Sequence, residues 1–135
     1  MEEEMAKILI VGQGQIGKAL RSMLSEHDVT TLDTYKGPAA DINDDSFFDR
    51  PRGFLFQPSK RGGGYDYVVC AAPQYDASRV HNLVCACNEL GIHYLDFSED
   101  VHVRKRISEI AIPRIFIACG CGLAPGMIQV IAQSL

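Results

Sequence analysis

The sequence has no tryptophan, no long hydrophobic run and no excess of basic residues. Its formal net charge of −4 excludes the strongly basic surface that binding to a nucleic-acid backbone requires. The chain begins with the acidic residues Glu2, Glu3 and Glu4, where a secretory signal has a basic segment. The apolar run from Ile8 to Val11 is too short to span a bilayer. These absences predict a cytoplasmic protein that binds neither nucleic acid nor membrane.

Cysteine is present, but not in a pattern that indicates disulfides or a metal site. There are five cysteines, and without an export signal this odd number predicts free thiols in a reducing compartment. Two C-x-C pairs occur, Cys85/Cys87 and Cys119/Cys121, whereas zinc sites typically use C-x2-C. Residues two apart on a helix point about 200° apart, so Cys85 and Cys87 cannot readily hold one ion. We therefore predict no metal site.

The most informative stretch is residues 7–17, which read KILIVGQGQIG. A run of mostly aliphatic residues, as a buried parallel strand requires, precedes Gly12, Gly14 and Gly17 in the order G-x-G-x-x-G. Gly12 permits a tight turn, Gly14 lets the backbone approach a pyrophosphate, and Gly17 lets the following helix pack closely. The free N–H groups of that helix, expected at about residues 15–25, would face the phosphates. This stretch predicts dinucleotide binding, and the alternative is a purely structural turn.

An acidic residue stands where the adenosine ribose of a dinucleotide would be bound. Asp33 ends a second expected strand, 19 residues beyond Gly14, close to the usual offset of about 20. An acid there accepts hydrogen bonds from both ribose hydroxyls and repels a 2′-phosphate, which favours NAD over NADP. The alternative is that Asp33 simply ends a strand in a turn. Asp41 and Ile42 could meet the adenine, or Asp41 could cap a short helix.

The remaining elements are predicted from aliphatic runs and from glycine and proline punctuation. We expect strands at about 29–33, 39–42, 65–73, 92–97 and 114–119, and helices at about 77–90, 100–111 and 127–135. Residues 44–49 predict a helical turn or two, and residues 50–64 an irregular surface loop pinned by Phe54, Leu55 and Phe56. The residues expected to face inward on the helices at 15–25 and 100–111 are Ile16, Ala19, Leu20, Met23, Leu24, Val101, Ile107, Ile110 and Ala111.

Together these elements predict an α/β protein with a doubly wound, mostly parallel sheet and helices on both faces, the Rossmann fold. With 135 residues, 47% of them hydrophobic, the chain suits one such domain. The last helix is apolar on nearly all sides, so we expect it to be buried against something. We therefore expect a nucleotide-binding domain at 1–126 and, at 127–135, the first helix of a following substrate and dimerisation domain. Its apolar surface also makes a homodimer an expectation.

Four segments resemble the saccharopine dehydrogenase-like group of NAD(P)-dependent oxidoreductases. They are ILIVGQGQIG at 8–17, CAAP at 70–73, GIHYLDFSED at 91–100 and GCGLAPGMI at 120–128. The first is shared by many Rossmann proteins, whereas the third and fourth are more specific. The resemblance covers most of the chain except about residues 43–64. It implies hydride transfer between NAD(P) and the amine carbon of an amino-acid substrate such as saccharopine or lysine.

The same resemblance implies a role for individual residues. The residues that would line the pyrophosphate are Gly12, Gly14, Gln15, Ile16 and Gly17, and Asp33 would bind the adenosine ribose. The adenine would be framed by Asp41 and Ile42. On the nicotinamide side, the ribose would pass Ala71, Ala72 and Pro73, and the nicotinamide would lie by Gly122, Leu123, Ala124 and Pro125. Asp96 and Tyr75 are the implied catalytic residues, near the nicotinamide and the substrate. A structural role for Asp96, such as holding the second glycine turn, is the alternative.

Two other functions compete with the oxidoreductase. One is a stand-alone nucleotide-sensing domain of the kind that gates potassium transporters, which has a similar length, the same glycine turn and the same acid. The segments at 93–100 and 122–126, and the apolar last helix, argue against it. The other is an oxidoreductase-like fold that binds no nucleotide and serves only in assembly.

Overall fold

The computed structural model describes residues 5–33, 42–43, 46–56, 64–71, 77–97, 100–110 and 113–120. Within these residues a single sheet has six strands in the order β3-β2-β1-β4-β5-β6, and every neighbouring pair is parallel. The strands are β1 (Lys7–Val11), β2 (Asp28–Asp33), β3 (Ile42–Asn43), β4 (Tyr67–Cys70), β5 (His93–Asp96) and β6 (Ile117–Ala118). The predicted fold class, a doubly wound parallel sheet, is therefore confirmed.

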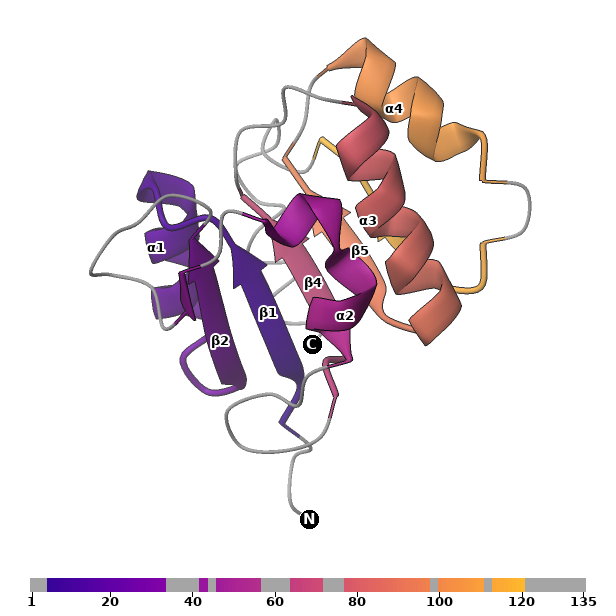
Figure 1. Ribbon diagram of the computed structural model, residues 1–135. Helices are drawn as coiled ribbons and strands as arrows, with labels where there is room; N and C mark the ends of the chain where they lie inside the picture. The colour runs from indigo at the N-terminus through magenta and orange to yellow at the C-terminus, as the bar shows by residue number, and fades with distance from the viewer. Residues whose placement is uncertain are drawn as a thin grey trace.

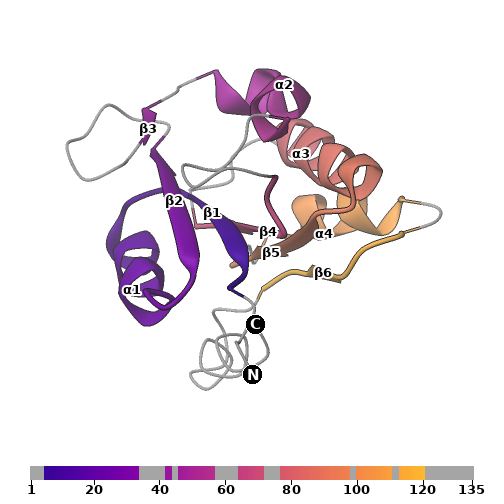
Figure 2. The ribbon, with the colours of Figure 1, turned by 90° about the horizontal axis from the view of Figure 1, so that it is seen from below.

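The two faces of the sheet are covered by different helices (Figures 1 and 2). The helix α1 (Gln15–Met23) lies on one face, where Leu20 and Leu24 pack with Ile8 and Ile10 of β1. The opposite face is covered by a 3-10 helix and three α-helices: η1 (Phe47–Asp49), α2 (Pro51–Leu55), α3 (Ala77–Leu90) and α4 (Val101–Ser108). Side chains of successive strand residues alternate between these two cores, as a strand buried on both faces requires.

Several predicted elements are confirmed within a residue or two. The first strand and the helix at 77–90 have the predicted bounds. Gly91 follows that helix with a φ of 73°, the left-handed conformation that favours glycine just after a helix. The helix α4 begins after Asp100, whose carboxylate accepts hydrogen bonds from the N–H groups of His102 and Val103. This side-chain cap accounts for the start of α4 at Val101.

The prediction of an irregular loop at 50–64 was wrong for residues 51–55, which form α2. Pro51 occupies the first turn, where its missing N–H costs nothing and its fixed φ suits a helix. The helix is held by Leu55, which is buried, by contact of the Phe54 ring with Phe47, and by an ion pair between Arg52 and Glu89 of α3. Phe56, expected to pin this segment, is instead 72% exposed.

The predicted inward face of α1 was only partly right. Leu20 and Leu24 are buried, but Ile16, Ala19 and Met23 are exposed. The face is set by Gly17, which is buried against the turn, so the positions three and seven residues beyond it lie against the sheet. Val101, also expected to face inward, is 73% exposed because it opens α4, whereas Val103 and Ile107 are buried.

The last described strand also differs from its prediction. We expected a buried strand at 114–119, but β6 covers only residues 117–118, which pair with β5. Ile117 and Ala118 are both only half-buried. The strand expected at 39–42 is described only from Ile42 onward. The predicted helix at 127–135, and with it the predicted domain division and the residue Ala111, lie outside the described residues. In the part of the chain that the structure describes, no helix is long and apolar enough to cross a membrane.

Candidate functional site

The candidate site lies at the carboxyl edge of the sheet, where β1 and β4 are neighbours. From β1 the chain proceeds to β2 and β3 on one side, and then returns past β1 to β4 on the other. Such a reversal of strand order opens a crevice beyond the strand ends, where ligands bind in open α/β sheets. The glycine turn follows β1 and Ala71 follows β4, and the two strand ends are joined by the bond from the Ala71 N–H to the Val11 carbonyl (2.7 Å).

The glycine turn has the backbone geometry that its sequence predicts. Gly12 has a φ of 102°, which L side chains rarely adopt, and its N–H donates to the carbonyl of Leu32 (2.6 Å). A β-carbon on Gly17 would overlap the Gly12 carbonyl, so this position accepts no larger residue. A β-carbon on Gly14 would meet nothing within 4 Å. The first and third glycines are therefore required by the fold, whereas the second leaves open space in front of the helix.

The beginning of α1 is suited to an anion. Gly14 occupies the N-cap and provides no side-chain oxygen to the first N–H groups, and the first turn contains no acidic residue. The backbone donors and the positive end of the helix dipole are therefore not neutralised by the chain's own carboxylates in that turn. Gln15 and Ile16, the first two helical residues, are exposed and border the same space. A phosphate or pyrophosphate fits the chemistry of this position.

One residue of the turn was not selected from the sequence. Gln13 is only 6% exposed, and its Nε2 donates to the Gly12 carbonyl (2.8 Å). Because that carbonyl can only accept, the amide must turn its Oε1 the other way, and within the described residues Oε1 is buried without a hydrogen-bond partner. The sequence signal that could have found Gln13 is an amide between two glycines of a predicted buried turn. Its side chain holds the turn closed from within.

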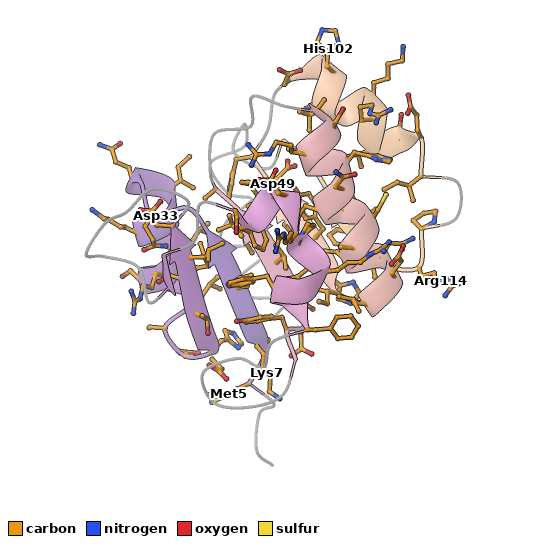
Figure 3. The ribbon with its side chains drawn as sticks, in the orientation of Figure 1. Met5, Lys7, Asp33, Asp49, His102 and Arg114 are labelled. Atoms are coloured by element: carbon orange, nitrogen blue, oxygen red, sulfur yellow. The ribbon has the colours of Figure 1, made fainter. Side chains whose placement is uncertain are left out.

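Asp33 lies at the same edge, at the end of β2 (Figure 3). It is half-buried and stands in register with Asn43 of β3, while its neighbour Leu32 accepts the hydrogen bond from Gly12. The glycine turn and the predicted ribose-binding acid are thus brought together by one backbone hydrogen bond. Lys7, in contrast, begins β1 at the opposite edge of the sheet.

Asp96 ends β5 at this edge but its side chain is fully buried. Its Oδ2 accepts from the hydroxyl of Tyr94 (2.8 Å), and its Oδ1 accepts from the N–H of Gly120 (3.2 Å). Burial, the neighbouring Cys70 and Asp96 itself raise the pKa of Tyr94 well above its ordinary value, so the phenol remains a donor. These bonds support the alternative role of Asp96, in which it holds the start of the second glycine turn. Its catalytic role stays a prediction.

Of the other predicted site residues, some are described by the structure and the rest lie outside the described part of the chain. Ala71 is described and half-buried beside Val11, and Ile42 begins β3 opposite Leu32. The residues that lie outside the described part of the chain are Asp41, Ala72, Pro73, Tyr75, Gly122, Leu123, Ala124 and Pro125. The adenine contacts of Asp41 and the entire nicotinamide end beyond Ala71 therefore remain predictions.

The two thiols of α3 are buried to different extents. Cys87 is buried and Cys85 half-buried, and burial followed by the proximity of Cys70 raises the pKa of Cys87 to about 12. The Sγ atom of Cys85 lies 3.6 Å from Nε2 of His81, which is one helical turn earlier. Among the described residues, no three His, Cys, Asp or Glu side chains are grouped so that they could hold a metal ion.

Comparison with known proteins supports the fold. No protein-family model matches the chain, and no curated protein matches it. A solved structure from Methylobacillus flagellatus, provisionally named an NAD-dependent epimerase/dehydratase, is similar with a TM-score of 0.51 at 16% identity. The similarity covers 86% of this chain and 53% of that one, so this chain spans about half the length of that protein. At this identity the likeness establishes a Rossmann-like α/β fold.

Proposed function

We propose that this chain binds a dinucleotide, NAD in preference to NADP, in the crevice beyond β1 and β4. The observation that carries the proposal is the contrast between two glycines of one turn. Gly17 is enforced by contact with Gly12, but a β-carbon on Gly14 would meet none of the described residues, so no packing constraint from them explains the absence of a side chain there. The backbone approach of a pyrophosphate does explain it.

The geometry around the turn fits the cofactor at two points. The pyrophosphate would lie at the N-terminus of α1, whose first turn contains no acidic residue, and the adenosine ribose would meet Asp33 at the end of β2. When bound, a nicotinamide cofactor supplies hydride transfer. The chain's own contribution is to bind and orient it: Gly12 and Gln13 fix the turn, and Asp33 accepts from the ribose hydroxyls. The structurally similar protein is also named as NAD-dependent.

The finer proposal is that this domain serves a saccharopine dehydrogenase-like oxidoreductase, acting on the amine carbon of an amino acid such as saccharopine or lysine. It rests on the resemblance of the segments at 91–100 and 120–128. The bond from the Gly120 N–H to Asp96, which joins these two segments at the carboxyl edge, supports it. We further propose that substrate and dimer contacts come from residues beyond 126, and that the protein acts in the cytoplasm. The competing proposal is a stand-alone nucleotide sensor.

A titration of NADH and of NADPH, followed by calorimetry, tests the proposal. We expect NADH to bind more tightly, and Asp33→Ala to weaken NADH more than NADPH because the ribose hydroxyls lose their acceptor. Glu26→Ala is the matched control, since it removes one exposed carboxylate in the turn between α1 and the start of β2, at the opposite edge of the sheet. Failure of both nucleotides to bind at millimolar concentration would overturn the proposal, and equal losses in Asp33→Ala would overturn the ribose assignment.

Separating the enzyme from the sensor requires the gene context and an activity assay. A downstream coding sequence for a mixed-sheet domain supports the enzyme, whereas a membrane channel supports the sensor. Reduction of NAD by saccharopine or lysine with the full-length protein would then identify the substrate class.

A further inference from the structure

A basic side chain of α1 lies on the same face of the sheet as Asp33. The Arg21 side chain is half-buried, and its Nη1 lies 3.5 Å from Oγ1 of Thr31, which is fully buried in β2. This contact places the guanidinium against β2. From the sequence, Lys36 was the nearest base to Asp33, but α1 brings Arg21 to the strand itself, from 12 residues upstream.

The alternation of β2 places Thr31 and Asp33 on this same face. Val29 packs in the core on the α1 side, whereas Leu32 packs in the core on the opposite side. Residues 29, 31 and 33 therefore face α1, and Asp33 lies one step of about 6.6 Å beyond Thr31 toward the carboxyl edge.

The direction of α1 brings the guanidinium toward that edge. The helix starts at Gln15, at the glycine turn, and runs away from the carboxyl edge. Side chains of a helix lean toward its N-terminus, so the long Arg21 side chain reaches back from the last turn toward the strand end. A guanidinium is a planar, permanently charged donor and suits a phosphate group.

We propose that Arg21 and Asp33 together determine the choice between NAD and NADP, with Arg21 as the cation that meets a 2′-phosphate on the adenosine ribose. This inference rests on the proposed function. In the native chain the Asp33 carboxylate accepts from the 2′-hydroxyl and repels a phosphate, so NADH binds better. Because the cation is already in place, removal of the carboxylate alone is expected to turn the preference toward NADPH.

The test is a comparison of Asp33→Ala with three double variants, each titrated calorimetrically with NADH and with NADPH. Asp33→Ala should raise the NADPH to NADH affinity ratio by about tenfold or more, since the carboxylate that repels a phosphate is removed while the Arg21 guanidinium remains. Adding Arg21→Gln should reverse that gain. Adding Arg104→Gln instead should preserve it, because Arg104 is an exposed base of α4 on the opposite face of the sheet.

Each outcome bears on a distinct claim. If Asp33→Ala/Arg21→Gln keeps the ratio of Asp33→Ala, Arg21 does not meet the phosphate and the inference is overturned. An equal loss of both nucleotides would also overturn it, because that pattern indicates a role in packing α1 on β2. Asp33→Ala/Arg21→Lys should keep part of the gain, as a charge effect requires. Absence of NADH binding to the native chain, in contrast, overturns the proposed function itself.

Discussion

The carbonyl oxygen of Gly12 lies so close to Gly17 that a β-carbon on residue 17 would overlap it. The contact joins the end of β1 to the first turn of α1, and Nε2 of Gln13 lies beside it. Neither backbone can move easily, because Gly12 also donates to Leu32 of β2. The turn is thus a packed junction of strand and helix, closed where Gly12 meets Gly17 and open at Gly14.

Gly17→Ala is expected to lower the free energy of unfolding by about 2 kcal/mol or more, because a methyl group overlapping backbone forces the helix away from the strand. Urea unfolding followed by circular dichroism measures the loss. Native stability in this variant would contradict the packed junction.

Gly14→Ala is the matched substitution in the same turn, with the opposite expectation. Its methyl group would meet nothing within 4 Å, so the free energy of unfolding should change by less than about 1 kcal/mol. NADH affinity should nevertheless fall by about tenfold or more, because the methyl group keeps the pyrophosphate from the backbone. If Gly14→Ala binds NADH like the native chain, the site is not at this turn.

Tyr94→Phe tests the buried hydrogen bond to Asp96. The hydroxyl donates to a carboxylate with no exposure to water, so its removal leaves a charged acceptor less satisfied. We expect a loss of about 1–3 kcal/mol in the free energy of unfolding, measured by urea titration. Tyr67→Phe, on the neighbouring strand and half-buried, is the control and should lose less. Equal losses in the two variants would show that the hydrogen bond to Asp96 adds nothing to the free energy of unfolding beyond the effect of removing a tyrosine hydroxyl.

The order of elements was predictable because glycine, proline and aliphatic runs punctuate this chain clearly. The run before Gly12 and the helix ending at Gly91 have local signals at both ends, and both have the predicted bounds. The glycine turn is likewise encoded locally, since Gly12 and Gly17 are required by contacts only five residues apart.

What could not be predicted depends on contacts between distant parts of the chain. The helix α2 is five residues long and too short to be stable alone, and it is held by Phe47 and by Glu89 of α3. The exposed position of Ile16 follows from the rotation that Gly17 imposes on α1, which apolar periodicity does not reveal. The proximity of Arg21 to β2 is a property of the packed fold, not of sequence spacing.

The buried thiol of Cys87 predicts a loss of stability in alkaline solution. Burial, and secondarily Cys70, raises the pKa of this thiol to about 12 in the folded chain, from an ordinary value of 9.0. Below pH 9 both states keep the proton, so the stabilising effect is complete. Between about pH 9 and 12 the unfolded chain releases the proton while the folded chain retains it, and stability falls as pH rises, by up to about 1.4 kcal/mol per pH unit.

Cys87→Ala removes this titrating group, so its free energy of unfolding should fall less steeply with pH than that of the native chain. The comparison uses slopes between pH 8 and about 11, because the lost thiol volume lowers the stability of Cys87→Ala at every pH. Cys85→Ala is the control on the same helix. That thiol is half-buried, and its pKa is raised by desolvation and by Glu89, so its removal should change the slope less. Parallel pH profiles for Cys87→Ala and the native chain would show that the Cys87 thiol ionises as readily in the folded chain as in the unfolded one.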